Sequence, residues 1–236
     1  MAIKAVLFDK DGTLIESDGT WIAVFKAFLA SAKKIGPDEV NALMAKAGYD
    51  VENDRLIPGG ILAGGTSQQA IEVWWPELDA EGVIEKWKLL NHDYAHLAQE
   101  LMRPLMPLVP IFDELHVMGL KLGVATNDTH SSATDHLHQL GVHDYFVDVI
   151  GADSVTIAKP SGQMIARFAK TTGLRPSEIA MVGDNPHDME EARAGGAGLA
   201  IAVLSGNAGR TDIEHLADYV LASVAELPAL MQKLAK

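Results

Sequence analysis

Two aspartates, Asp9 and Asp11, lie two positions apart and directly follow the apolar run Ala5–Phe8. The run is short and uncharged, which is typical of a buried strand in a parallel sheet. In such sheets ligands bind beyond the carboxyl ends of the strands, where these acids are expected to lie. Two carboxylates followed at once by Gly12 are poorly placed to stabilise a fold, but well placed to hold a cation and attack a substrate. The pattern therefore predicts an enzyme.

Polar groups also follow a second predicted strand and begin a later loop. Thr126 and Asn127 come after the apolar run 120–125, and a predicted helix begins within a few residues. The hydroxyl of Thr126 and the nearby backbone amides can therefore face an anion. Lys159 precedes Pro160, which favours an extended backbone, so its ammonium can project from a loop.

A third predicted strand, residues 179–182, is followed by Asp184 at its carboxyl end. Asn185 can cap the next helix, with Pro186 in its first turn. Asp188 is expected in that same turn, where a carboxylate also compensates the helix dipole. Acids, a threonine and a lysine thus recur in order at or near the ends of predicted core strands.

The segments that position these residues alternate between strand-like and helix-like patterns. Short apolar runs, most with β-branched residues, predict parallel strands, and amphipathic stretches that end in glycine predict crossover helices. The alternation predicts a doubly wound, Rossmann-like α/β core. The predicted strands are residues 3–8, 120–125, 146–150, 179–182 and 199–204, and the predicted helices are 131–140, 163–172 and 187–194.

One long segment, residues 18–101, does not follow this alternation. It has almost no strand pattern, and helical periodicity dominates it, which predicts an inserted helical cap domain. Its predicted helices are residues 21–35, 37–47 and 81–101. The proline-rich stretch 103–110 is interpreted as the return linker. The predicted division is a catalytic core of residues 1–17 and 102–236 with a cap domain of residues 18–101.

Composition limits the classes of protein that the chain can belong to. The 236 residues include no cysteine, which removes disulfides, thiolate zinc sites and cysteine nucleophiles, and fits a reducing compartment such as the cytoplasm. No stretch resembles a signal-peptide core or reaches the roughly 18 apolar residues of a membrane span. The net charge of -13 disfavours nucleic acid as a partner. We therefore expect a cytoplasmic protein that binds neither membranes nor nucleic acid.

The four groups of residues resemble, in order and spacing, the four motifs of the haloacid dehalogenase superfamily. The matching positions are Asp9-Lys10-Asp11-Gly12-Thr13, Thr126-Asn127, Lys159-Pro160, and Gly183-Asp184 with Asp188. The helical insert after the first motif resembles the cap of the phosphoglycolate phosphatase and β-phosphoglucomutase branch. The resemblance covers essentially the whole chain. It implies a hydrolase that acts on a small phosphorylated metabolite.

The resemblance implies a two-step reaction at the first motif. Asp9 is expected to attack phosphorus and form an aspartyl phosphate, while Thr126, Asn127 and nearby amides bind the phosphoryl oxygens. Asp11 is expected to protonate the leaving alcohol and then to deprotonate the water that hydrolyses the intermediate.

The attack of a carboxylate on a phosphate dianion requires positive charge nearby. Each pair of unit charges about 4 Å apart repels by about 4 kcal/mol at an effective dielectric constant of about 20. By resemblance, Mg²⁺ is held by Asp9, Asp184 and the backbone carbonyl of Asp11. Lys159 is expected to add a further positive charge and to contact the phosphate. Asp188 is expected to orient Lys159 or a metal-bound water.

Other reactions are compatible with the same motifs. Dehalogenases resemble the chain less, because they lack the equivalent of Asp11. Phosphomutases of the β-phosphoglucomutase type share the intermediate, but commonly carry valine where this chain has Thr13. A noncatalytic phosphoacceptor module, similar to response-regulator receivers, also places acids, threonine and lysine at strand ends. The helical insert and Asp11 disfavour it. A phosphatase is the leading hypothesis.

Substrate selection is expected to come from the cap, since a phosphate site alone cannot distinguish one phosphomonoester from another. The glycine-rich residues 58–65 predict a loop that either faces the core as a specificity element or is a plain turn. If the substrate carries a carboxylate, as phosphoglycolate does, Arg55 is the candidate partner. Lys10 departs from the family, where this position is often apolar. His136 is interpreted as a surface or packing residue.

Overall fold

A six-stranded parallel sheet forms the core of the computed structural model, which describes residues 2–235. Its strands, in the spatial order β5-β4-β1-β6-β7-β8, are β5 (Phe146–Ile150), β4 (Lys121–Ala125), β1 (Ala5–Phe8), β6 (Ile179–Gly183), β7 (Leu199–Val203) and β8 (Tyr219–Leu221). The chain runs outward from β1 in both directions, so β1 lies at a topological switch point. The predicted doubly wound α/β fold is confirmed, and β8 is an additional edge strand.

Apolar residues of β1 alternate between the two faces of the sheet. Val6 and Phe8 belong to one hydrophobic cluster, and Ala5 and Leu7 to the other. This period of two explains why a continuous apolar run forms a strand that is buried on both sides. The first cluster is covered by α7 (Val109–Val117), α8 (His130–Gln139) and α12 (Leu227–Leu234). The second is covered by α9 (Gln163–Thr172), α10 (Pro186–Gly195) and α11 (Arg210–Ile213).

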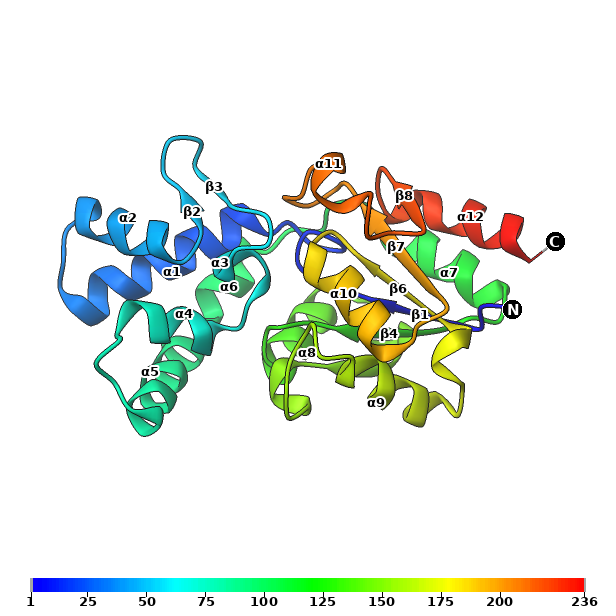
Figure 1. Cartoon of the computed structure of the whole chain (residues 1–236), viewed down its shortest axis with the longest axis horizontal. Coiled ribbons are helices and arrows are strands. Elements are labelled where there is room, and N and C mark those ends of the chain that lie inside the picture. The colour runs from blue at the N-terminus through cyan, green and yellow to red at the C-terminus, as the bar shows by residue number, and fades with distance from the viewer. Residues whose placement is uncertain (1, 236) are drawn as a thin grey trace.

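A separate helical body lies beside the sheet, on the left in Figure 1. Its helices are α1 (Asp18–Lys33), α2 (Pro37–Lys46), α3 (Ile61–Gly64), α4 (Ser67–Trp74), α5 (Ala80–Asp93) and α6 (Ala95–Leu101). It has its own hydrophobic cluster, in which Trp74 and Trp75 are buried among aromatic rings. We propose residues 18–101 as a cap domain and residues 1–17 with 102–236 as the core.

The cap differs from the sequence expectation in two details. It contains a short antiparallel pair, β2 (Tyr49–Asp50) with β3 (Arg55–Leu56), where only helices were predicted. Two residues per strand are too few to show a pattern in the sequence. The predicted helix 81–101 is interrupted at Tyr94, which separates α5 from α6. Single 3₁₀ turns, all in the core, span His143–Tyr145, Ala152–Ser154, Pro176–Glu178 and Val224–Glu226.

The glycine-rich segment 58–65 lies against the core. The amide of Gly59 donates to Asn185 Oδ1 at 2.9 Å, and Asn127 Nδ2 donates to the carbonyl of Gly64 at 2.7 Å. A side chain at Gly64 would overlap the ring of His187, so the close approach requires glycine there. Within residues 2–235, no helix combines the length and the apolarity needed to cross a membrane.

Candidate active site

Three aspartates meet at the carboxyl ends of β1 and β6. Asp9 follows β1, Asp184 follows β6, and Asp188 lies in the first turn of α10. Because β1 and β6 are neighbouring parallel strands, their ends bring the three carboxylates together. One oxygen from each lies within 4.8 Å of the others, and all three residues are buried.

Glycines around Asp184 allow the backbone to approach its carboxylate closely. Gly12 has a φ of +82°, and a side chain there or at Gly206 would overlap the Asp184 carboxylate. The amide of Asn207 donates to Asp184 Oδ2 at 3.2 Å. The turn at Gly12 therefore packs directly against the carboxylate of Asp184.

Lys159 neutralises part of this negative charge. Its Nζ donates to Asp9 Oδ1 and to Asp188 Oδ1, each at 2.6 Å, and its side chain is fully buried. Burial alone would lower the pKa of Lys159, but the carboxylates of Asp188 and Asp9 outweigh it and raise that pKa. The ammonium is therefore charged throughout the neutral range. The structure thus brings together the predicted partners Asp9, Lys159 and Asp188.

The aspartate cluster fits a divalent metal ion. Burial raises the pKa of Asp9 to about 6, and Lys159 offsets only part of that effect. Burial, together with the charges of Asp9 and Asp188, raises the pKa of Asp184 well above its usual value. Carboxylates crowded in this way require a cation to stay ionised, and an all-oxygen ligand set suits Mg²⁺. The carboxylate of Asp11 is not part of this cluster.

Asp11 instead faces the cap. Trp21 Nε1 in α1 donates to Asp11 Oδ1 at 2.7 Å, and Lys10 Nζ lies 2.8 Å from Asp11 Oδ2. Burial raises the pKa of Asp11, but the charge of Lys10 and hydrogen bonds from Lys10 and Trp21 outweigh it and lower that pKa. Neither contact was predicted. The cap therefore contacts, through Trp21, the acid that the family resemblance leads us to expect as the proton carrier.

The Lys10 ammonium contacts three polar side chains in the interior of the protein. Besides Asp11, its Nζ lies 3.1 Å from Asp128 Oδ2 and 3.2 Å from His136 Nδ1, and its side chain is fully buried. His136 is also buried, so it belongs to a polar network rather than to a surface or apolar packing position. Burial would lower the pKa of Lys10, but Asp11 and Asp128 raise it.

Replacing this lysine by methionine should destabilise the protein strongly. Lys10→Met leaves the largely buried carboxylates of Asp11 and Asp128 without their cation, and breaking such a pair costs about 3 kcal/mol or more. Urea denaturation should show this loss in the free energy of unfolding. The matched control is Lys4→Met, since Lys4 pairs with Glu178 but has a 57% exposed side chain. The control should lose less than about 1 kcal/mol. Equal losses in both variants would contradict a structural role for the Lys10 network.

Thr126 and Asn127 follow β4, as predicted, but their side chains differ in function. Thr126 is buried at the strand end, and its Oγ1 accepts from the amide of Asp128 at 3.1 Å. Asn127 holds the Lys159 loop: its Oδ1 accepts from the Lys159 amide at 3.0 Å, and its Nδ2 donates to the Lys159 and Gly64 carbonyls. The Asn127 side chain therefore connects core, loop and cap, and direct phosphate binding by that side chain is not supported.

Arg55 does not reach the site. It lies in β3 with an exposed side chain, and its Nε is 3.5 Å from Asp50 Oδ2 in the paired strand. It is not among the residues that line the cavity between cap and core. The expectation that Arg55 meets a substrate carboxylate is therefore not supported, because the hairpin directs it to its own neighbour.

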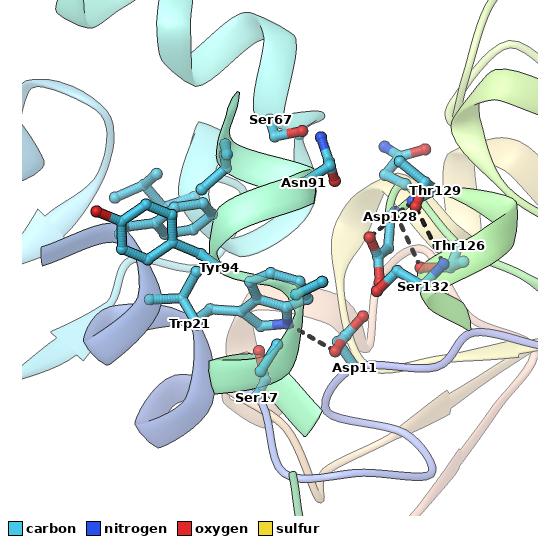
Figure 2. Close-up of a pocket in the computed structure, with 18 of the residues that line it drawn as sticks. Asp11, Ser17, Trp21, Ser67, Asn91, Tyr94, Thr126, Asp128, Thr129 and Ser132 are labelled. Atoms are coloured by element: carbon cyan, nitrogen blue, oxygen red, sulfur yellow. Dashed lines mark hydrogen bonds between the residues drawn. The ribbon is translucent and has the colours of Figure 1, made fainter. Parts of the chain in front are cut away.

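A cavity of about 180 Å³ lies between the cap and the core, directly over Asp9 and Asp11. Figure 2 shows its two sides: Trp21 and Tyr94 come from the cap, and Thr126 and Asp128 come from the loop after β4. His187 also lines it, and burial lowers the pKa of that imidazole to about 3, so it is uncharged. A substrate in this cavity meets the catalytic candidates on its floor and cap residues around its far end.

Known proteins similar to this chain match it over nearly its whole length. A phosphoglycolate phosphatase of Vibrio vulnificus (strain CMCP6) is 29% identical over 226 residues, which cover 95% of this chain and 94% of that protein. A phosphoglycolate phosphatase of Chromobacterium violaceum is 29% identical over 234 residues, covering 98% and 97%.

Solved structures agree in fold across the whole chain. A predicted phosphoglycolate phosphatase from Haemophilus somnus 129pt has a TM-score of 0.76 at 20% identity, covering 98% of each chain. A predicted phosphatase from Clostridium acetobutylicum also has a TM-score of 0.76, at 18% identity, covering 99% of this chain and 100% of that one. The family model described as haloacid dehalogenase-like hydrolase matches residues 3–196, most of the chain. The protein therefore belongs to the haloacid dehalogenase-like hydrolase family.

Proposed function

We propose that the protein is a Mg²⁺-dependent phosphatase that hydrolyses a small phosphomonoester through an aspartyl phosphate on Asp9. The observation that carries the proposal is the contact of Asp9 with Lys159, beside Asp184 and Asp188, at the floor of a cavity. A buried carboxylate with a lysine at 2.6 Å is an attacking group with a counter-charge in place. The names of the relatives, phosphoglycolate phosphatases, support this reaction class.

The first step transfers the phosphoryl group to the protein. A carboxylate oxygen of Asp9 forms a bond to phosphorus while the bond from phosphorus to the alcohol oxygen breaks. The departing alkoxide takes a proton from Asp11, so the product leaves as a neutral hydroxyl group. Asp11 is ionised in the resting site. The arriving phosphate raises its pKa by charge repulsion, so Asp11 takes up a proton from solvent before it passes that proton to the alkoxide.

The second step releases phosphate from the aspartyl phosphate. Asp11, now ionised again, takes a proton from water as the water oxygen attacks phosphorus, and the bond to Asp9 breaks. Lys10 and Trp21 favour the ionised form of Asp11, which suits it as a base. Inorganic phosphate leaves, and both aspartates return to their starting states once Asp11 has lost its proton to solvent.

Positive charge and a hydroxyl group stabilise the phosphoryl oxygens in both steps. Lys159 supplies a fixed ammonium beside Asp9, and Thr126 supplies a hydroxyl at the end of β4, where it lines the cavity. Mg²⁺, held by Asp9, Asp184 and the backbone carbonyl of Asp11, would offset negative charge on the phosphoryl group. Asp188 positions Lys159, since its Oδ1 accepts from Nζ at 2.6 Å.

A panel of phosphomonoesters, assayed for phosphate release with Mg²⁺ and with EDTA, tests this proposal. We expect release only with the metal, because the crowded carboxylates of Asp9 and Asp184 need a cation beside them to stay ionised, and Asp9 must be ionised to attack. Release that survives EDTA would contradict the metal dependence. Isomerisation of a sugar phosphate without phosphate release would instead indicate a mutase. The family match disfavours the noncatalytic alternative.

A further inference from the structure

The cap side of the cavity includes a continuous group of apolar and aromatic side chains. Trp21 and Phe25 of α1 stack with ring centroids 5.7 Å apart and an interplanar angle of 27°, and both line the cavity. Leu62 of α3, Leu90 of α5 and Tyr94 add to this apolar wall. Figure 2 shows Trp21 and Tyr94 on the cap side of the cavity, opposite the polar loop after β4. The part of a substrate that lies farthest from phosphorus therefore meets an apolar surface.

No cationic side chain of the lysine or arginine type lines this cavity within residues 2–235. The two lysines nearest to the catalytic acids, Lys10 and Lys159, have fully buried side chains. Each is held between two carboxylates, so neither is available to a group on the substrate beyond the phosphate. A carboxylate on the leaving alcohol would find no counter-charge here.

The remaining polar residues of the wall are neutral or acidic. Ser67 and Asn91 on the cap and Ser132 on the core offer uncharged hydrogen-bonding groups. Asp128 and Asp135 also line the cavity. Asp128 is paired with Lys10 and Asp135 is exposed, so their repulsion is weak, but neither offers a counter-charge to a second negative group on the substrate.

The volume of the cavity limits the size of the leaving group. An apolar cavity of about 150 Å³ holds a benzene molecule. The cavity here, about 180 Å³, is of the same order, and the phosphoryl group over Asp9 occupies part of it, so the leaving group is at most about the size of one six-membered ring. Glycolate, with two carbon atoms, would leave most of the apolar wall without a contact.

We propose that the substrate is a phosphomonoester whose leaving alcohol is uncharged, ring-sized and apolar on the face that meets α1 and Tyr94. This inference rests on the proposed phosphatase function and narrows it. The proposed substrate differs from phosphoglycolate, the substrate in the names of the relatives, since phosphoglycolate is small and carries a carboxylate.

Three substrates test the charge and the apolar contact separately. Phosphoglycolate and phosphoglycolamide have nearly the same shape and differ in one carboxylate charge, while benzyl phosphate adds a ring. With native protein and Mg²⁺, kcat/KM for phosphoglycolamide should exceed that for phosphoglycolate by at least about tenfold. The kcat/KM for benzyl phosphate should exceed that for phosphoglycolamide by at least about tenfold, since each buried methylene contributes a factor of this order.

A charge introduced at Asn91 tests the same inference from the side of the protein. Asn91 lies on α5, half-buried, and lines the cavity. Asn91→Lys should raise kcat/KM for phosphoglycolate relative to phosphoglycolamide by about tenfold, because it supplies the missing cation. Asn91→Met introduces a side chain of about the length of lysine but without its charge, and should leave that ratio as in the native protein. A ratio that rises equally in both variants would contradict the role of charge.

The outcomes distinguish this inference from the function on which it rests. If phosphoglycolate is the best of the three substrates of the native protein, the inference is wrong but the phosphatase stands. If phosphoglycolamide is hydrolysed faster than benzyl phosphate, the inferred apolar contact between the leaving group and the cap is wrong. If no phosphate is released from any phosphomonoester in the presence of Mg²⁺, the proposed function itself fails, and the inference fails with it.

Discussion

The Asp9→Asn variant is expected to release no measurable phosphate from any substrate that the native protein hydrolyses, a loss of at least about 10⁴-fold in kcat. The amide is not a nucleophile, so no aspartyl phosphate can form. The substitution also removes one of the two carboxylates that hold Lys159 and one of the acids of the cluster with Asp184. Steady-state phosphate release with Mg²⁺ measures the effect.

Loss of activity in this variant must be separated from loss of the fold. An asparagine oxygen can still accept a hydrogen bond from Lys159. The substitution also removes a buried carboxylate that is costly to ionise, since burial raises the pKa of Asp9 to about 6. The melting temperature, followed by circular dichroism, should therefore stay close to the native value. The control is Asp144→Asn, since the Asp144 side chain is fully exposed, and it should keep full activity. Activity in a folded Asp9→Asn variant would contradict covalent catalysis.

The main elements of the fold were predictable because their signals are local. Apolar runs such as Ala5–Phe8 are buried on both faces and contain no polar residue, so the strands stand out in the sequence. The parallel arrangement then brings Asp9 and Asp184 to one edge of the sheet without any further information. The edge strand β8 was missed because it has only three residues, all of them half-buried.

The contacts of Lys10 were not predictable, because they join distant parts of the chain. His136 is 126 positions away from Lys10, and Trp21 reaches Asp11 from the cap. Nothing in local propensity encodes such a contact. A lysine between two strand-end acids is nevertheless a usable signal, since a charge at a buried position requires partners of opposite charge.

Asn127 and Arg55 show a second limit of prediction from the sequence. Position in the sequence places Asn127 at the end of β4, but its side-chain hydrogen bonds to the Lys159 loop and to Gly64 decide what the amide does. Arg55 is close to the cap loop in sequence, yet the hairpin turns it toward Asp50. Side-chain direction depends on tertiary contacts that a spacing pattern does not contain.

Lys159→Met is expected to lower phosphate release by about 10³-fold, because it removes the fixed positive charge beside the attacking carboxylate. It should also lower the free energy of unfolding by about 3 to 5 kcal/mol, since Asp9 and Asp188 lose their buried partner. The formal charge of the cluster of three carboxylates and one ammonium changes from -2 to -3. Mg²⁺ should therefore bind this variant more tightly than the native protein, which calorimetry can measure, although catalysis is weaker.

The double variant Lys159→Met with Asp188→Asn separates charge from catalysis. The second change returns the formal charge of the cluster from -3 to -2, because two carboxylates then remain without the ammonium. Urea denaturation should show that stability is partly restored relative to Lys159→Met, while phosphate release stays low, since the ammonium is still absent. Recovery of activity together with stability would show that Lys159 only balances charge, and would remove it from the phosphate-binding site. If the double variant is as unstable as the single one, uncompensated charge is not the cause of the loss.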